Sequence, residues 1–143
     1  MILMKQRGFT VIELVVVIVF LIFAGILFFV QKNNLEVAGR DETRKTAINA
    51  IYYGLEESFY KQNGYYPAEI NDKNLTTLDS KLFTDPNGIK LGQTTEKIND
   101  EEIPVQSEYR YEPTNCTDSK CKSYTLRADL EAEADYVKKS RNN

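Results

Sequence analysis

The stretch Gly8-Phe9-Thr10-Val11-Ile12-Glu13, with the unbroken apolar run of residues 14–30 behind it, decides the fold of this chain. The 22 residues from Phe9 to Val30 contain a single charged side chain, that of Glu13. As a helix they extend about 33 Å at roughly 1.5 Å per residue, which matches a bilayer core of about 30 Å. The sequence therefore predicts a helix that can span a membrane.

The residues on either side of the apolar run predict how it lies in the membrane. Lys5 and Arg7 precede it, and basic residues favour a cytoplasmic N-terminus with the rest of the chain outside. An ordinary secretory signal has a shorter apolar region, followed by small residues at its cleavage site. Here Gln31-Lys32-Asn33-Asn34 follows instead. We therefore expect a single-pass anchor in the cytoplasmic membrane.

Glu13 is the anomaly within this segment. A carboxylate inside hydrocarbon costs at least about 2.5 to 3.5 kcal/mol, so it is normally paired, protonated or functional. If the chain is cut after Gly8, Phe9 carries a free amine, which can pair with Glu13 of the same helix or of a neighbouring subunit. The sequence leaves both pairings open, together with a glutamate that reaches the membrane surface or stays protonated.

The motif Lys5-Gln6-Arg7-Gly8-Phe9-Thr10-Val11-Ile12-Glu13-Leu14, followed by an apolar run, resembles the N-terminus of type IV pilins and pseudopilins. The resemblance implies that a prepilin peptidase cuts after Gly8, that Phe9 is N-methylated, and that Phe9 and Glu13 serve filament assembly. It also implies a helical filament of identical subunits, built by an assembly machinery in the cytoplasmic membrane. Many pilins have a proline at the position of Val30. Its absence here leaves Gly25 either as a place where the helix loosens or as a site of close packing.

The composition gives little support to an enzyme or a nucleic-acid-binding protein. From residue 31 onward there are 16 basic and 20 acidic residues, without a concentrated basic patch for phosphates. Histidine is absent, which excludes Ser-His-Asp and Cys-His nucleophiles and histidine-containing zinc motifs. The chain also lacks phosphate-binding loops of the P-loop or dinucleotide type. We therefore predict no catalytic residue, cofactor, metal or nucleic-acid partner.

The second half of the predicted helix is amphipathic. Apolar residues recur at three- and four-residue spacing, while most charged residues fall elsewhere around the helix. The apolar stripe comprises Ile48, Ile51, Tyr52, Leu55 and Phe59, and the residues placed elsewhere are Arg44, Lys45, Asn49, Glu56 and Glu57. No proline lies between Phe9 and Asn63, so one helix of about 80 Å is expected, with Gly25, Gly39 and Gly54 as weak points.

Turn residues divide the rest of the chain. Asn63-Gly64 ends the helix with a left-handed cap, and Tyr65-Tyr66-Pro67 turns the chain. Between Ala68 and Pro86, one short helix or 3₁₀ turn is expected to cover the core of the head, as suggested by Leu75, Leu78, Leu82 and Phe83. A β-turn is expected at Asp85-Pro86-Asn87-Gly88. Residues 92–102 are expected to form a solvated charged loop, since their acids lack the spacing of an EF-hand. The alternative is a calcium site, which related pseudopilins can hold in a loop of the head.

A β-hairpin is predicted near the C-terminus. Tyr109 and Tyr111 alternate with polar residues, and apolar and polar residues also alternate along residues 124–131, which indicates two strands that each have one buried face. Cys116 and Cys121 lie between the two strands, where a disulfide would close the tip in an oxidising space. Free thiols are the main alternative. Two cysteines supply only half of a zinc site, and their spacing is wider than the redox C-x-x-C pair. From Ala132 onward we expect a mobile polar tail.

The predicted fold is therefore α+β, the type IV pilin fold, in which a long N-terminal helix packs on a small antiparallel sheet of three or four strands. Residues 1–8 are the leader, 9–30 the membrane and filament-core half of the helix, 31–62 its amphipathic half, and 63–143 the head. The expected function is that of a structural subunit of a type IV pilus, held in membrane lipid before assembly and extracellular afterwards. The alternatives are a pseudopilin of a secretion or competence machine, a monomeric single-pass binding protein, and a membrane-anchored enzyme.

Overall fold

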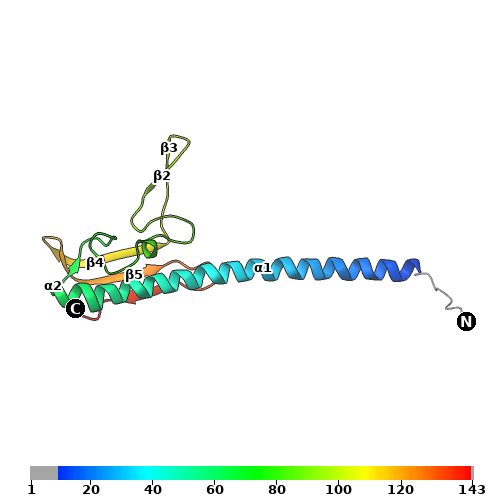
Figure 1. Cartoon of the computed structure of the whole chain (residues 1–143), viewed down its shortest axis with the longest axis horizontal. Helices are drawn as coiled ribbons and strands as arrows, with labels where there is room; N and C mark the ends of the chain where they lie inside the picture. The colour runs from blue at the N-terminus through cyan, green and yellow to red at the C-terminus, as the bar shows by residue number, and fades with distance from the viewer. Residues whose placement is uncertain (1–9, 143) are drawn as a thin grey trace, which may run out of the picture. The chain divides into compact units, whose positions relative to one another are not determined.

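The computed structural model of the chain describes residues 10–142. They form two compact units that divide between Glu36 and Val37. The first is the N-terminal part of a helix, and the second contains the remainder of that helix and the β-strands (Figure 1). All buried hydrophobic side chains among the described residues belong to the second unit, which we call the head.

The long helix has the extent that the sequence predicts, with one local departure. Helix α1 (Val11–Tyr53) continues into a π-helical stretch, η1 (Gly54–Tyr60), and a last turn, α2 (Lys61–Asn63). Gly64 ends it in the left-handed conformation with φ of 74°, and its N–H donates to the Tyr60 carbonyl at 2.7 Å. The predicted glycine cap is confirmed, whereas the π-helical stretch was not predicted.

The main sheet of the head has four antiparallel strands: β1 (Tyr66–Pro67), β4 (Tyr109–Thr117), β5 (Lys120–Ala128) and β6 (Tyr136–Lys139). Strand β5 is central. It pairs with β4 on one side, and with β1 and then β6 on the other. The β4–β5 hairpin runs from the pair Tyr109 and Ala128 to the pair Thr117 and Lys120, which confirms the predicted hairpin.

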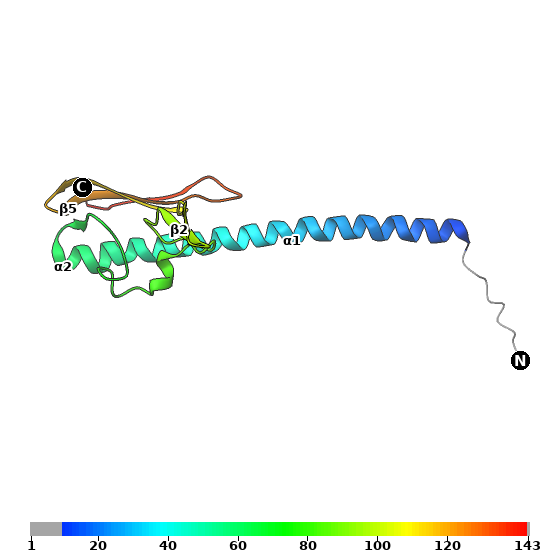
Figure 2. The ribbon, with the colours of Figure 1, turned by 90° about the horizontal axis from the view of Figure 1, so that it is seen from above.

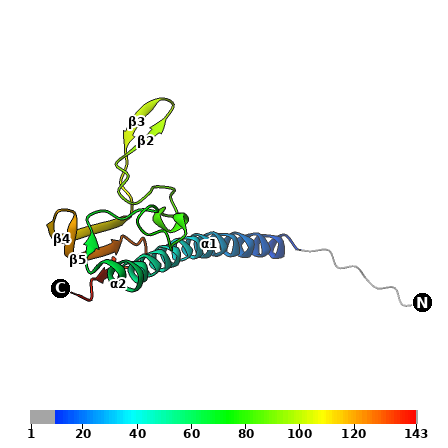
Figure 3. The same cartoon turned by 60° about the vertical axis from the view of Figure 1, so that its left-hand side comes forward.

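A second, two-stranded sheet replaces the loop predicted for residues 92–102. Strands β2 (Thr95–Ile98) and β3 (Glu101–Pro104) form a hairpin that projects from the head (Figure 3). Asn99 and Asp100 connect them with φ of 52° and 66°. Positive φ at both central residues is the pattern of the two-residue hairpin turn that matches strand twist, and asparagine and aspartate tolerate it. That turn signal was missed because neither face of the hairpin is buried, so the flanking residues lack a regular apolar alternation.

Between β1 and β2 the chain covers the core with short turns. The 3₁₀ helix η2 (Ser80–Phe83) is capped by the Asp79 carboxylate, which accepts from the Lys81 N–H at 2.9 Å. The predicted turn at residues 85–88 is present, closed by a 2.9 Å bond from the Gly88 N–H to the Asp85 carbonyl. The buried Asp85 carboxylate also accepts from the Glu108 N–H, which ties this turn to the start of β4.

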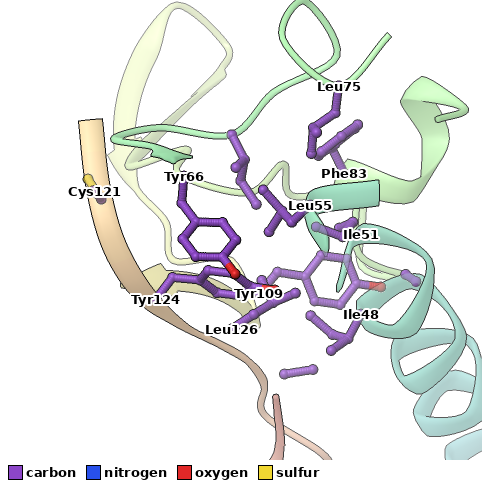
Figure 4. Close-up of a cluster of buried hydrophobic side chains, with 13 residues drawn as sticks. Ile48, Ile51, Leu55, Tyr66, Leu75, Phe83, Tyr109, Cys121, Tyr124 and Leu126 are labelled. Atoms are coloured by element: carbon purple, nitrogen blue, oxygen red, sulfur yellow. The ribbon is translucent and has the colours of Figure 1, made fainter. Parts of the chain in front are cut away.

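The core lies between the helix and the sheet, which confirms the α+β prediction. Ile48, Ile51 and Leu55 are fully buried on one face of the helix. Side chains from the strands and turns close over them (Figure 4), namely Tyr66, Leu75, Phe83, Tyr109, Tyr124 and Leu126. Viewed from above, β5 runs beside the C-terminal part of the helix (Figure 2). The stripe read from the sequence is therefore the face that meets the sheet.

The C-terminal residues are ordered against the head, so the prediction of a mobile tail from Ala132 was wrong. Strand β6 pairs with β5, and the Ser140 N–H then donates to the Tyr124 carbonyl at 3.1 Å. The Arg141 guanidinium reaches the helix, where it contacts the Tyr52 hydroxyl at 3.0 Å and the Glu57 carboxylate at 2.6 Å. The composition of the tail is polar, but tertiary hydrogen bonds and ion pairs hold it.

Reduction of the Cys116–Cys121 disulfide should loosen the tip of the β4–β5 hairpin and leave the head folded. The two cysteines are five residues apart, and closing so short a loop stabilises the fold by about 2 kcal/mol on a chain-entropy basis. Amide hydrogen exchange of the full chain in detergent micelles, with and without reductant, measures the effect. Loss of protection at Leu126 and Ala128, far from the tip, would contradict it.

Candidate functional site

The first turn of the long helix is organised by Thr10 and Glu13. The Glu13 carboxylate accepts from the Thr10 N–H at 2.9 Å and from the Thr10 hydroxyl at 3.0 Å. In return the Glu13 N–H donates to the Thr10 hydroxyl at 3.3 Å. This reciprocal arrangement is a capping box, which satisfies N–H groups that a helix start otherwise leaves without partners. Glu13 therefore has a local role at the helix start.

The other residues of the predicted processing and assembly site, Gly8 and Phe9, lie outside the described residues. The cleavage after Gly8, the methylation of Phe9 and the pairing of its amine with Glu13 therefore stay predictions. The capping box uses a single carboxylate oxygen of Glu13, Oε2, for both bonds from Thr10. A carboxylate has about four acceptor positions, so the cap leaves room for a further donor.

After the cap, the helix is apolar on all sides. Within residues 11–30 the large hydrophobic side chains are exposed, from 47% at Val17 to 81% at Val11. An 18-residue window of this helix has a mean hydropathy of 3.2 and no buried residue. A helix that is hydrophobic all round belongs in lipid or against other helices. By length and composition it can therefore cross a membrane.

One side of this segment has a shallow hollow between its own side chains. The hollow is lined only by apolar residues: Val15, Val16, Val19, Phe20, Phe23, Ala24 and Leu27. Gly25 lies in open space, with no atom within 4 Å of the position that a Cβ would occupy. Small residues on a membrane helix let a second helix approach closely. Within its own chain, this segment leaves its large apolar side chains uncovered.

The head contains a buried ion-pair network that sequence reasoning missed. Asp41 and Arg44 are almost fully buried, and their side chains are 3.0 Å apart. Arg44 also contacts the Glu131 carboxylate at 2.7 Å, and the Asp41 carboxylate accepts from the Glu131 and Ala132 N–H groups at 2.9 Å. Together these contacts hold the loop between β5 and β6 against the helix.

The prediction that placed Arg44 off the apolar stripe was wrong. Arg44 lies four residues before Ile48, so helical spacing puts both on the same face. Its charge suggested an exposed position, but Asp41 and Glu131 compensate that charge where it is buried. The spacing was therefore a usable signal, while the acidic partner 87 residues away was not visible in the sequence.

These contacts lower the pKa values of the Glu131 and Asp41 carboxyl groups. Hydrogen bonds from Arg40 and Arg44 lower the pKa of Glu131 to about 2. Burial alone would raise the pKa of Asp41, but the N–H groups of Glu131 and Ala132 and the Arg44 guanidinium outweigh it, so this pKa is lowered. Both groups are therefore carboxylates at neutral pH.

A second buried network surrounds Glu56, which the sequence also placed away from the core. The Glu56 carboxylate accepts from the hydroxyls of Tyr66 at 3.0 Å and Tyr124 at 2.8 Å, and from the Arg141 N–H at 3.2 Å. Glu56 belongs to the π-helical stretch η1. A π-helix has more residues per turn than an α-helix, so residues after Gly54 turn to another face than regular spacing predicts.

The Glu56 network connects the helix to three other segments of the head, since the partners of Glu56 come from β1, β5 and the C-terminal segment. Burial and the bond to Glu56 raise the pKa of the Tyr124 hydroxyl, so it stays protonated and donates. Among residues 10–142 the structure contains no group of three or more His, Cys, Asp or Glu side chains that could hold a metal ion. What the two networks can do is fasten the sheet and the chain end to the helix.

Glu131→Gln should destabilise the head more than Glu133→Gln, the matched control, which removes only a surface contact with Lys45. Arg44 would stay buried but lose one of its two charged partners. The lowered pKa also predicts that the contribution of Glu131 is complete above its ordinary pKa of 4.5 and is lost as the pH falls toward about 2. Denaturant unfolding of the full chain in micelles between pH 7 and pH 2 measures both effects. Equal losses in the two variants would contradict the role of Glu131.

Comparison with protein-family models, with curated proteins and with solved structures finds no match to this chain.

Proposed function

We propose that this chain is a structural subunit of a type IV pilus. In this proposal it is inserted in the membrane through residues 9–30, cut after Gly8, and polymerised through the same residues into a helical filament. The observation that carries the proposal is the helix of residues 11–30, which is apolar on every side, buries none of its large side chains and begins with one carboxylate held in its first turn. Such a segment suits two environments in turn, lipid and a bundle of identical helices.

Packing and the acid have different roles in this assembly. Moving an apolar helix from lipid to a helix bundle gains little from the hydrophobic effect, because lipid is itself apolar. Association then depends on close packing, which the hollow between residues 15–27 and the open position at Gly25 support. A lone carboxylate in that bundle is costly unless a cation meets it. A Phe9 ammonium of a neighbouring subunit would meet this need at one axial register.

The capping box makes this pairing easier to arrange. While Thr10 holds Oε2 of Glu13, the side chain is fixed beside the helix start. A preorganised acceptor loses less rotamer entropy when a partner arrives. We therefore assign two roles to Glu13. It caps the helix in the single subunit, and in the filament its carboxylate also accepts a hydrogen bond from the Phe9 ammonium of a neighbouring subunit.

The remaining parts of the proposal follow from the resemblance at residues 5–14. A prepilin peptidase removes residues 1–8, Phe9 is methylated, and an assembly machinery in the cytoplasmic membrane draws the subunits into an extracellular fibre. The disulfide between Cys116 and Cys121 supports exposure of the head to an oxidising space. The subunit itself is a building block without an enzymatic activity.

A second candidate, a monomeric membrane-anchored binding protein, has one observation in its favour. A groove of about 700 Å³ lies in the head between the loop after β1 and the start of β4. Polar and aromatic side chains line it, including Asn71, Gln93 and Tyr111. Volumes of this order accommodate small ligands. Native chains that still begin at Met1 and form no fibres would favour this candidate over the pilus.

Glu13→Gln should reduce the amount of fibre by at least about tenfold, because the amide cannot offset a neighbour's ammonium and one such pair is lost at each subunit contact. Membrane insertion and the head should be unchanged. The matched control is Glu36→Gln, which changes an exposed acid farther along the same helix. Electron microscopy and quantification of material sheared from cells measure the outcome. Normal fibres from Glu13→Gln would remove this account of Glu13.

Gly8→Val should leave residues 1–8 attached, because the bulkier side chain lies at the proposed cleavage position. Intact-mass measurement of the membrane-bound protein distinguishes a chain that begins at Phe9 from one that keeps its leader. In the unaltered protein we expect the Phe9 form with the added mass of one methyl group. Efficient cleavage of the Gly8→Val variant would show that the processing site is elsewhere.

A further inference from the structure

The β2–β3 hairpin is an arm of the head with no core of its own. All residues of β2 and β3 are exposed, and this arm, residues 95–104, projects away from the main sheet (Figures 1 and 3). An isolated two-stranded hairpin is at best marginally stable in water. The arm therefore gains little stability from burial of its own side chains.

The two faces of the arm differ. From the register, Glu96 lies opposite Ile103 and Ile98 lies opposite Glu101. Because side chains alternate along a strand, the two isoleucines share one face. Both are exposed, at 47% for Ile98 and 39% for Ile103. The arm also carries four acids, Glu96, Asp100, Glu101 and Glu102, against one lysine, Lys97. On the isoleucine face lie Glu96 and Glu101, whereas Glu102 lies on the other face opposite Lys97, with 3.8 Å between its carboxylate and the Lys97 ammonium. The isoleucine face thus combines an apolar pair with two acids.

Basic side chains gather at another part of the head. Five cations make up a surface that we name the basic edge. They lie at the start of β5, in β6 and at the chain end: Lys120, Lys122, Lys138, Lys139 and Arg141. Glu57 offsets part of this charge through its contact with Arg141. Two exposed apolar side chains belong to the same region, Val137 in β6 and Tyr53, whose ring lies 5.7 Å from the Arg141 guanidinium.

The arm and the β6 part of the basic edge belong to opposite edges of the main sheet, whereas Lys120 and Lys122 lie at the start of the central strand β5. The arm leads directly into β4, which pairs with one side of β5. Strand β6 pairs with the other side of β5. Figures 1 and 3 agree with this order, since the arm projects from one side of the head and the chain end lies on the other. Within one head the arm and β6 therefore lie on different sides of β5.

We propose that the arm of one subunit docks on the basic edge of a second copy of this chain. The charges are complementary, and each surface places apolar side chains among its charges, as interfaces with a polar rim do. Two different patches of one molecule make a head-to-tail contact, which extends into rings or open helical filaments. The partner is thus another subunit of the filament, and this inference rests on the proposed function.

This contact places the heads of neighbouring subunits in one order. The N-terminal helices supply packing along the filament core, while docking of the arm would set which head follows which. Complementary charges contribute specificity and approach rate more than affinity. The contact should therefore weaken as salt increases, because exposed charges are screened.

Cross-linking of assembled fibres tests the contact directly. A zero-length carbodiimide reagent joins a carboxylate to an amine only when the two are in contact. In unaltered fibres we expect cross-links from Glu96 or Glu101, the two acids on the isoleucine face, to Lys122 or Lys139, identified by peptide mass spectrometry. The same treatment of subunits dispersed in detergent is the control, and it should yield none of these cross-links.

Charge reversal tests the same contact in a second way. Glu96→Lys with Glu101→Lys should reduce the fibre yield about tenfold or more, since like charges then face each other. Adding Lys122→Glu and Lys139→Glu should restore the yield to within about twofold. The matched control, Glu69→Lys with Asp72→Lys, reverses two exposed acids in the loop after β1 and should assemble normally. No residue of the arm is buried, so the head should stay folded in these variants, which circular dichroism checks.

The outcomes separate this inference from the proposed function. Fibres that lack these cross-links, or that assemble unchanged with reversed charges on the arm, overturn the docking and leave the pilus assignment standing. Cross-links from the arm to Lys73 or Lys90 instead would overturn it as well, because the arm would then face another surface. If the unaltered chain forms no fibres, both proposals are wrong. If the basic edge binds anionic vesicles or DNA while the arm variant assembles normally, the edge has a different partner and the docking is overturned.

Discussion

The constraint on which the structure depends is that a long helix must bury its apolar surface, and this chain covers only part of it. In the head, Ile48, Ile51 and Leu55 are enclosed by the sheet. Along residues 11–30 the apolar side chains have no such cover among the described residues. Water is a poor environment for such a surface. By length and composition, this uncovered segment can cross a membrane.

In the head, a small sheet is held on the helix by a small apolar core together with polar contacts. Its apolar contacts are supplemented by two buried carboxylate networks, one around Asp41 and Arg44 and one around Glu56. Buried charges contribute to stability only when their partners are in place. These networks therefore make the sheet specific in its position, since sliding β5 or the chain end along the helix would leave charges without partners.

Much of the fold could be predicted because its signals are local. The helix of residues 11–30, the cap at Gly64 and the β4–β5 hairpin all follow from composition, from periodicity or from residues with special backbone preferences. The β2–β3 hairpin was missed because neither face of it is buried, so periodicity gave no signal and only the turn at Asn99 and Asp100 marked it. Of the candidate site, Glu13 was found by its anomaly, whereas its bond to Thr10 was not foreseen although the spacing of a capping box was present.

The sequence by itself determined the membrane-length helix, the lone acid in its first turn and the cysteines of the hairpin tip, because each depends on residues close together in the chain. Only the tertiary structure decided that Arg44 and Glu56 are buried, that the last described residues pair with the head, and that the acidic arm joins one edge of the main sheet while the basic strand β6 forms the other. Those outcomes depend on partners up to 91 residues away in the chain. Composition and spacing carry no record of such pairs, whereas the free energy of a buried charge depends on them.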